Sequence, residues 1–125
     1  MREPWLVGAG GFIGSILRYG LSGAAQQISG STTFPYGTLA VNVCGCVAIG
    51  VAGGLIDARQ LFGPEVRVFL LIGVLGGFTT FSTFGYETIA LARDGDLAHA
   101  ASSVLLHVVL AVGGTWLGYG LAVLR

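Results

Sequence analysis

Charge is absent from three long stretches of this chain. Residues 19–56, 68–86 and 97–124 contain no Asp, Glu, Lys or Arg, which gives runs of 38, 19 and 28 uncharged positions. An α-helix needs about 20 predominantly apolar residues to cross the hydrocarbon core of a bilayer. Because helices and closed barrels are the structures that satisfy all their backbone polar groups in lipid, runs of this length predict transmembrane helices.

The composition also favours lipid over water as the surroundings. Of the 125 residues, 54% are hydrophobic and 10% are charged, whereas charged residues make up about 25% of a soluble domain. The apolar residues do not gather on one stripe, as they would on helices with one face in water. We therefore expect residues 1–125 to form a single domain of an all-α, multi-pass integral membrane protein.

The longest uncharged stretch is interrupted by a turn. Residues 29–37 combine Gly, Pro, Ser and Thr, which mark a loop rather than a helix interior. The loop separates two helices and brings the expected number of spans to four. The expected transmembrane helices are Trp5–Ile28, Gly37–Ala58, Glu65–Leu91 and Asp96–Leu124.

The arginines at the expected helix ends give a weak orientation signal. On one side of the bundle lie Arg2, Arg59, Arg67 and Arg125, and on the other lie Arg18 and Arg93. Basic residues favour the cytoplasmic side of a membrane, and four against two is a small excess. The pattern is compatible with insertion in both orientations.

Charge and motif spacing exclude several classes of function. Six basic residues balance six acidic ones, so the chain lacks the basic footprint of a nucleic-acid-binding protein. Gly8, Gly11 and Gly14 have the spacing of a dinucleotide-binding loop, which needs a preceding strand and an acid about 20 residues later. Here seven residues precede Gly8, and the next acid is Asp57. We expect no nucleic acid and no nucleotide as partner and, without a nucleophile–base pair, no enzyme activity.

Polar side chains inside the expected spans line up on helix faces. Such residues usually face protein or a water-filled path, because exposure to lipid is costly. They recur, with small residues among them, at spacings of three or four, which place each set on one face. The sets are Gly11, Ser15, Arg18 and Ser22 in the first helix, Thr38, Asn42 and Cys46 in the second, and His99, Ser103 and His107 in the fourth. Each polar group either holds two helices together or lines a wet path.

The third expected helix carries a sequence that disfavours a continuous helix. Adjacent Gly76 and Gly77 precede Thr79 and Thr80, and glycine costs about 1 kcal/mol relative to alanine in a helix while threonine loses rotamer freedom. We therefore expect a break. Backbone carbonyls freed by a break are hard oxygen ligands for a small cation.

Two phenylalanines follow the expected break. Phe81 and Phe84 are three residues apart and face the same way. In a membrane span such rings commonly face lipid or the protein core, but the edge of an aromatic ring is electropositive and can also attract an anion. An anion held by ring edges is bound weakly enough to leave, which conduction requires.

Three segments together closely resemble the Fluc (CrcB) fluoride channels. They are GGFIGSILRY at residues 10–19, GTLAVNVCG at 37–45 and GVLGGFTTFSTF at 73–84. The resemblance implies an antiparallel homodimer in membrane lipid, with two pores for the fluoride ion and a structural Na⁺ at its centre. It also implies passive flow of fluoride down its gradient, which lowers the fluoride concentration in the cytoplasm.

The resemblance also implies roles for individual residues. Carbonyls of Gly76 and Thr79 from both subunits would hold the Na⁺, and Phe81 and Phe84 would form an aromatic box along the pore. Asn42 would donate a hydrogen bond there. The other implied pore residues are Arg18 in the vestibule, Thr38, Thr80, Ser82 and Thr83 along a polar track with Glu87 behind the break, and Ser103 and His107 in the fourth helix.

The fourth helix departs from the family pattern. Ser103, His107 and Ala111 occupy positions where the family tends to carry polar side chains, and Ala111 offers no hydrogen bond. If His107 lines the pore, its protonation near the ordinary histidine pKa of about 6.5 is expected to change conductance.

Two other functions remain open from the residues alone. A small multidrug-type transporter coupled to protons is also short, four-helical and dimeric, but needs a carboxylate inside the membrane. Such transporters place the acid in the first helix, where this chain has none within the span, and Glu87 is the remaining candidate. A non-transporting assembly subunit would carry no ordered polar stripes.

Overall fold

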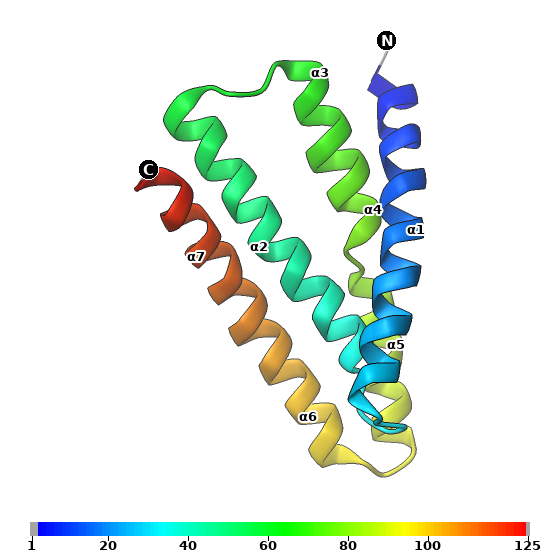
Figure 1. Cartoon of the computed structure of the whole chain (residues 1–125). Helices are drawn as coiled ribbons and strands as arrows, with labels where there is room; N and C mark the ends of the chain where they lie inside the picture. Colours follow the sequence, from blue (N-terminus) through cyan, green and yellow to red (C-terminus); the bar gives the residue numbers. More distant parts are fainter. Residues whose placement is uncertain (1–2, 125) are drawn as a thin grey trace.

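The computed structural model describes residues 3–124, and within that range it is helical apart from short connections. The all-α class is confirmed there. The elements form four rods (Figure 1): α1 (Glu3–Ser29); α2 (Tyr36–Arg59); a third rod of α3 (Pro64–Arg67), η1 (Val68–Leu75), α4 (Gly76–Phe78) and α5 (Phe81–Arg93); and a fourth of α6 (Leu97–Leu106), η2 (His107–Ala111) and α7 (Val112–Val123). Arg2 and Arg125, part of the expected charge bias, lie outside the described residues.

Three rods of the described chain are long and apolar enough to cross a membrane. They are Tyr36–Arg59, Pro64–Arg93 and Leu97–Val123, which correspond to the second, third and fourth expected spans. The first expected span lies within α1, a helix of 27 residues that is less apolar because glycines, serines and Arg18 are spread along it. The crossing of α1 through the membrane stays a prediction.

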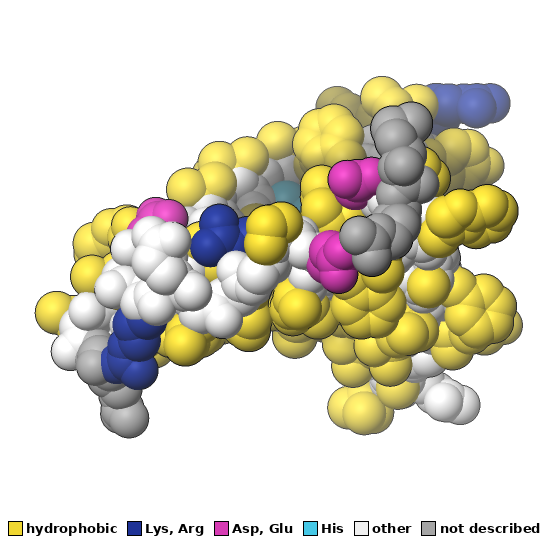
Figure 2. Space-filling view, turned by 90° about the horizontal axis from the view of Figure 1, so that it is seen from above, with side chains coloured by type: hydrophobic (Ala, Val, Ile, Leu, Met, Phe, Trp, Pro, Cys, Tyr) yellow, Lys and Arg dark blue, Asp and Glu magenta, His cyan; other side chains and the backbone are white. Residues whose placement is uncertain are grey.

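The outer surface of the bundle is largely apolar. Seen from the end that carries both termini (Figure 2), hydrophobic side chains cover much of the flanks. Large side chains are widely exposed, among them Trp5 at 82% and Trp116 at 77%. A soluble monomer rarely shows so much contiguous apolar surface, whereas lipid or another chain would cover it.

The Gln26 side chain ties the loop between α1 and α2 to the end of α1. The Gln26 amide donates hydrogen bonds to the carbonyl oxygens of Ser31 (2.8 Å) and Phe34 (2.9 Å), and its Oε1 accepts one from the Gly37 N–H (2.9 Å). The expected loop is therefore present, and it is ordered against the end of α1.

The fourth rod begins where the sequence predicts. Asp96 caps α6, because its Oδ1 accepts from the His99 backbone N–H (3.2 Å) and its Oδ2 lies 2.6 Å from His99 Nδ1. The hydrogen bond to the ring, followed by that to the backbone, lowers the pKa of the Asp96 carboxyl below its ordinary value.

Glycines bring α1 into backbone contact with the third rod. A Cβ on Gly14 would collide with the carbonyl oxygen of Val74, and one on Gly77 would lie 2.8 Å from the carbonyl oxygen of Gly11. Small residues allow such close approach in membrane bundles, where association depends on packing rather than on the hydrophobic effect.

The break in the third rod is confirmed. Thr79 and Thr80 take extended backbone, with ψ of 155° at Thr79 and φ of −149° at Thr80. Gly76 and Gly77 remain helical in α4, so the break falls at the threonine pair rather than at the glycine pair. Gly77 instead serves the contact with α1.

Gly14→Ala is expected to destabilise the protein by about 2 kcal/mol, because the added methyl overpacks the contact between α1 and the third rod. The measurement is thermal unfolding of the purified protein in detergent. Gly20→Ala is the matched control, since a Cβ there meets nothing within 4 Å and alanine favours the helix. Equal melting temperatures for the two variants would contradict the close approach.

Candidate functional site

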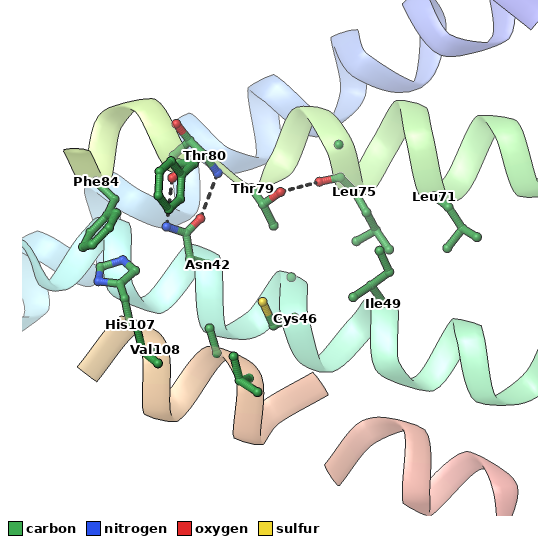
Figure 3. Close-up of a pocket in the computed structure, with 15 residues that line it drawn as sticks. Asn42, Cys46, Ile49, Leu71, Leu75, Thr79, Thr80, Phe84, His107 and Val108 are labelled. Carbon is green, nitrogen blue, oxygen red and sulfur yellow. Dashed lines mark hydrogen bonds between the residues drawn. The ribbon is translucent and has the colours of Figure 1, made fainter. Parts of the chain in front are cut away.

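Asn42 of α2 pairs with the broken backbone of the third rod (Figure 3). Its Oδ1 accepts from the Thr80 N–H at 2.8 Å, and its Nδ2 donates to the Thr80 carbonyl at 3.0 Å. Both residues are buried. The side-chain amide thus satisfies the two backbone groups that the break exposes in an apolar interior, where unpaired groups are costly.

The same break removes the helical donors of two carbonyls. In a continuous helix the carbonyls of Gly76 and Thr79 would accept from the N–H groups of Thr80 and Thr83. Those two N–H groups donate instead to Asn42 Oδ1 (2.8 Å) and to Thr80 Oγ1 (3.2 Å). The two carbonyls predicted to hold Na⁺ are therefore among those that lose their helical donors at the break.

Hydroxyl groups cluster at the start of α5. Thr80 is the N-cap of this helix, and its Oγ1 donates to Thr83 Oγ1 at 3.0 Å and lies 3.4 Å from Ser82 Oγ. The three residues of the predicted polar track that follow the break thus form one hydrogen-bonded group. Hydroxyls can rotate to donate or accept, which suits a group that meets an anion transiently.

An inner cavity of about 430 Å³ lies beside the break. Its lining includes Asn42, Thr79, Thr80, Phe81, Phe84 and His107. Most of the wall is apolar, with few polar groups among aromatic and aliphatic side chains (Figure 3). The residues come from α2, the third rod and η2, so the tertiary fold assembles this cavity.

A second, outer cavity of about 510 Å³ lies on the side of α1. Arg18, Ser22, Thr38, Thr80 and Thr83 line it. Thr80 lines both cavities, so the hydroxyl cluster stands between them. Arg18 has no ion-pair partner within residues 3–124, which leaves its positive charge available to an anion.

The two phenylalanines meet edge to face. Their ring centroids are 5.4 Å apart with an interplanar angle of 60°. Phe81 is 82% exposed on the single chain, whereas Phe84 is half-buried and lies 4.2 Å from the His107 ring. Phe84 therefore belongs to the inner cavity, and Phe81 lies at its open side.

The fourth-helix residues are buried, but they do not all line a cavity. His107 is 7% exposed and lines the inner cavity. Ser103 is fully buried, and its carbonyl oxygen lies 2.9 Å from His107 Nδ1. Neither Ser103 nor Ser82 lines the inner or the outer cavity. Ser103 is buried behind the cavity wall, whereas Ser82 is exposed on the single chain.

Glu87 has a partner that sequence reasoning did not identify. Thr38 Oγ1 donates to Glu87 Oε1 at 2.7 Å, and Glu87 Oε2 is buried without a partner in the described chain. An acid within an apolar run signals that some donor must face it, but the spacing does not say which. The contact joins α2 to α5 below the break.

Asn42→Ala is expected to destabilise the protein by about 2–4 kcal/mol, since two buried backbone groups of Thr80 lose their partners. Thermal unfolding in detergent measures the loss. Cys44→Ala is the matched control, because Cys44 is exposed on the same helix. If the melting temperature of Asn42→Ala equals that of the control within error, the amide does not stabilise the broken backbone at Thr80.

The chain is similar to a well-populated set of known proteins. Residues 5–119 match the family described as "CrcB-like protein, Camphor Resistance (CrcB)". A protein from Geotalea daltonii named fluoride-specific ion channel FluC is 46% identical over 122 residues, 98% of each chain. Proteins of the same name from Methylobacillus flagellatus and Elusimicrobium minutum are 41% and 44% identical, over 97% and 95% of this chain and 94% and 92% of their own.

Proposed function

The chain belongs to the CrcB family, and on that basis we propose that it is a fluoride channel of the cell inner membrane, through which F⁻ leaves the cytoplasm passively. The similar proteins carry that function in their names. The observation in this chain that supports it most is the meeting of the two cavities at Thr80, among hydroxyls, an amide and ring edges.

The two cavities suggest a sequence of sites for the ion. Arg18 attracts an anion into the outer cavity by its unpaired charge. The Thr80 and Thr83 hydroxyls then replace part of the hydration shell, which a small and strongly hydrated ion holds tightly. In the inner cavity the second Nδ2 hydrogen of Asn42 is not used by Thr80, so it is free to donate to the ion.

The aromatic rings complete the path without trapping the ion. Phe81 and Phe84 offer electropositive ring edges in an apolar wall. A permanently charged Lys or Arg there would hold fluoride too tightly for release, since charges interact strongly at low dielectric. Weak donors in series allow both entry and exit.

In this proposal α1 also crosses the membrane, which brings the number of spans to four. At 1.5 Å per residue its 27 residues extend about 40 Å, which exceeds a hydrocarbon core of about 30 Å. Arg18 then faces the outer cavity rather than lipid. Its placement agrees with the rule that charges in a span face a wet cavity.

A second, antiparallel copy of the chain and a Na⁺ belong to the same proposal. Phe81 and Gly76 are exposed on the single chain, and a partner in lipid would cover them. The freed carbonyls of Gly76 and Thr79 are hard oxygen ligands, which fit Na⁺. The cation would join the breaks of two subunits and neutralise carbonyl dipoles that have lost their N–H donors.

Replacement of either phenylalanine by isoleucine is expected to lower fluoride flux about fivefold, because loss of a ring edge costs about 1 kcal/mol. Purified Phe81→Ile and Phe84→Ile proteins in liposomes loaded with fluoride, read with a fluoride electrode, provide the measurement. Phe12→Ile is the matched control, since Phe12 is 69% exposed on α1 and lines neither cavity.

Full flux in both variants would leave the ring edges without a role. Chloride-loaded vesicles test selectivity, and little chloride release is expected. Flux of an organic cation that requires a proton gradient would instead favour a proton-coupled transporter with Glu87 as its acid.

Na⁺ is expected to raise the melting temperature of the purified protein in a saturable manner, because a ligand of the folded state at 100 times its dissociation constant stabilises by about 2.7 kcal/mol. Titration of NaCl at constant ionic strength, with N-methylglucamine as the balancing cation, measures the effect. K⁺ in place of Na⁺ is the control for size. Identical melting curves in all three salts would exclude the proposed Na⁺ site.

A further inference from the structure

His107 is a titratable side chain that the proposed path does not yet use. It is 7% exposed, begins η2 and lines the inner cavity with Asn42 and Phe84. Its Nε2 is buried and has no hydrogen-bond partner within the described chain. A buried polar atom without a partner beside a cavity points to a ligand that the protein chain does not supply.

The contact at the other ring nitrogen determines the tautomer. His107 Nδ1 lies 2.9 Å from the carbonyl oxygen of Ser103, whereas the Ser103 hydroxyl is 3.5 Å away. A carbonyl oxygen only accepts hydrogen bonds, so Nδ1 carries a hydrogen and donates it. In the neutral ring Nε2 is therefore an acceptor with a lone pair.

This assignment has a direct consequence for an anion in the inner cavity. Fluoride only accepts hydrogen bonds. In the neutral ring the lone pair of Nε2 would face the lone pairs of the ion, so the ring repels fluoride. Once Nε2 gains a proton, both ring nitrogens donate, and the Nε2–H group can donate to fluoride with a full positive charge behind it. We propose that His107 is a proton-switched fluoride ligand, which binds the ion in the inner cavity when Nε2 is protonated.

The neighbouring ring supports the charged form. The centroid of Phe84 lies 4.2 Å from that of His107 with an interplanar angle of 38° (Figure 3). A cation within about 6 Å of an aromatic centroid is attracted to the ring face. Both rings line the inner cavity, so a protonated His107 and Phe84 would act on fluoride from the same wall.

Other titratable side chains lie on α5, on α2 and elsewhere along the fourth rod. From α5, Glu87 lies one turn beyond Phe84 with Oε2 unpartnered, and from α2, Cys46 lines the same cavity. Along the fourth rod, His99 is paired with Asp96 at the exposed start of α6, and Tyr119 of α7 donates to Asp57. Glu87 is the group whose protonation must be separated from that of His107.

The inference rests on the proposed fluoride channel, and its test is the fluoride concentration that gives half-maximal flux. Purified protein in liposomes is assayed at about pH 5 and about pH 8, so that the interval extends well below the range in which a free imidazole titrates. The pH is equal on both sides, a potassium ionophore carries the balancing charge, and protein-free vesicles correct for hydrogen fluoride that crosses lipid.

In the wild type, the half-maximal concentration is expected to be about fivefold lower at the acidic pH, because a charged donor binds more strongly than a neutral one. His107→Gln removes the difference, since its amide does not titrate. His99→Gln keeps the full difference and serves as the matched control. Glu87→Gln also keeps it if the switch is His107.

Different failures separate the two proposals. Equal half-maximal concentrations at both pH values in a conducting wild type overturn the proton switch and leave the channel intact. A difference that persists in His107→Gln and disappears in Glu87→Gln also overturns it. Absence of fluoride flux at both pH values overturns the proposed function together with the switch.

Discussion

The pairing of Asn42 with Thr80 is the interaction on which the rest of the structure depends. A helix broken at membrane depth leaves backbone groups unpaired, and lipid offers nothing to bond them. The Asn42 amide takes both groups of Thr80, at 2.8 and 3.0 Å. Thr80 can then cap α5, and the break becomes a stable feature between two cavities rather than a defect.

Close packing through glycine makes that arrangement possible. Contact between α1 and the third rod at Gly11 and Gly77 brings the outer cavity, with Arg18, to the level of the break. The π-helical turns η1 and η2 lie in two of the three rods that form the inner cavity. Such turns often occur at functional sites because they redirect side chains, and η2 begins at His107.

The path is electrostatically graded. A full charge, Arg18, stands in the outer cavity, hydroxyls stand between the cavities, and ring edges and an amide stand in the inner cavity. Strong attraction at the entrance concentrates the anion, whereas weaker contacts inside permit it to move on. His107 adds to this series a group that repels an anion when its ring is neutral and attracts it when the ring is protonated.

The sequence by itself determined the all-α class, the boundaries of three apolar rods and the break in the third, because charge-free length and the Thr-Thr pair act locally. Which groups meet was decided by the tertiary structure. Asn42 bonds Thr80 across 38 residues of sequence and Thr38 bonds Glu87 across 49. Helical spacing places a polar side chain on a face, but its partner on another helix follows only from how the rods pack.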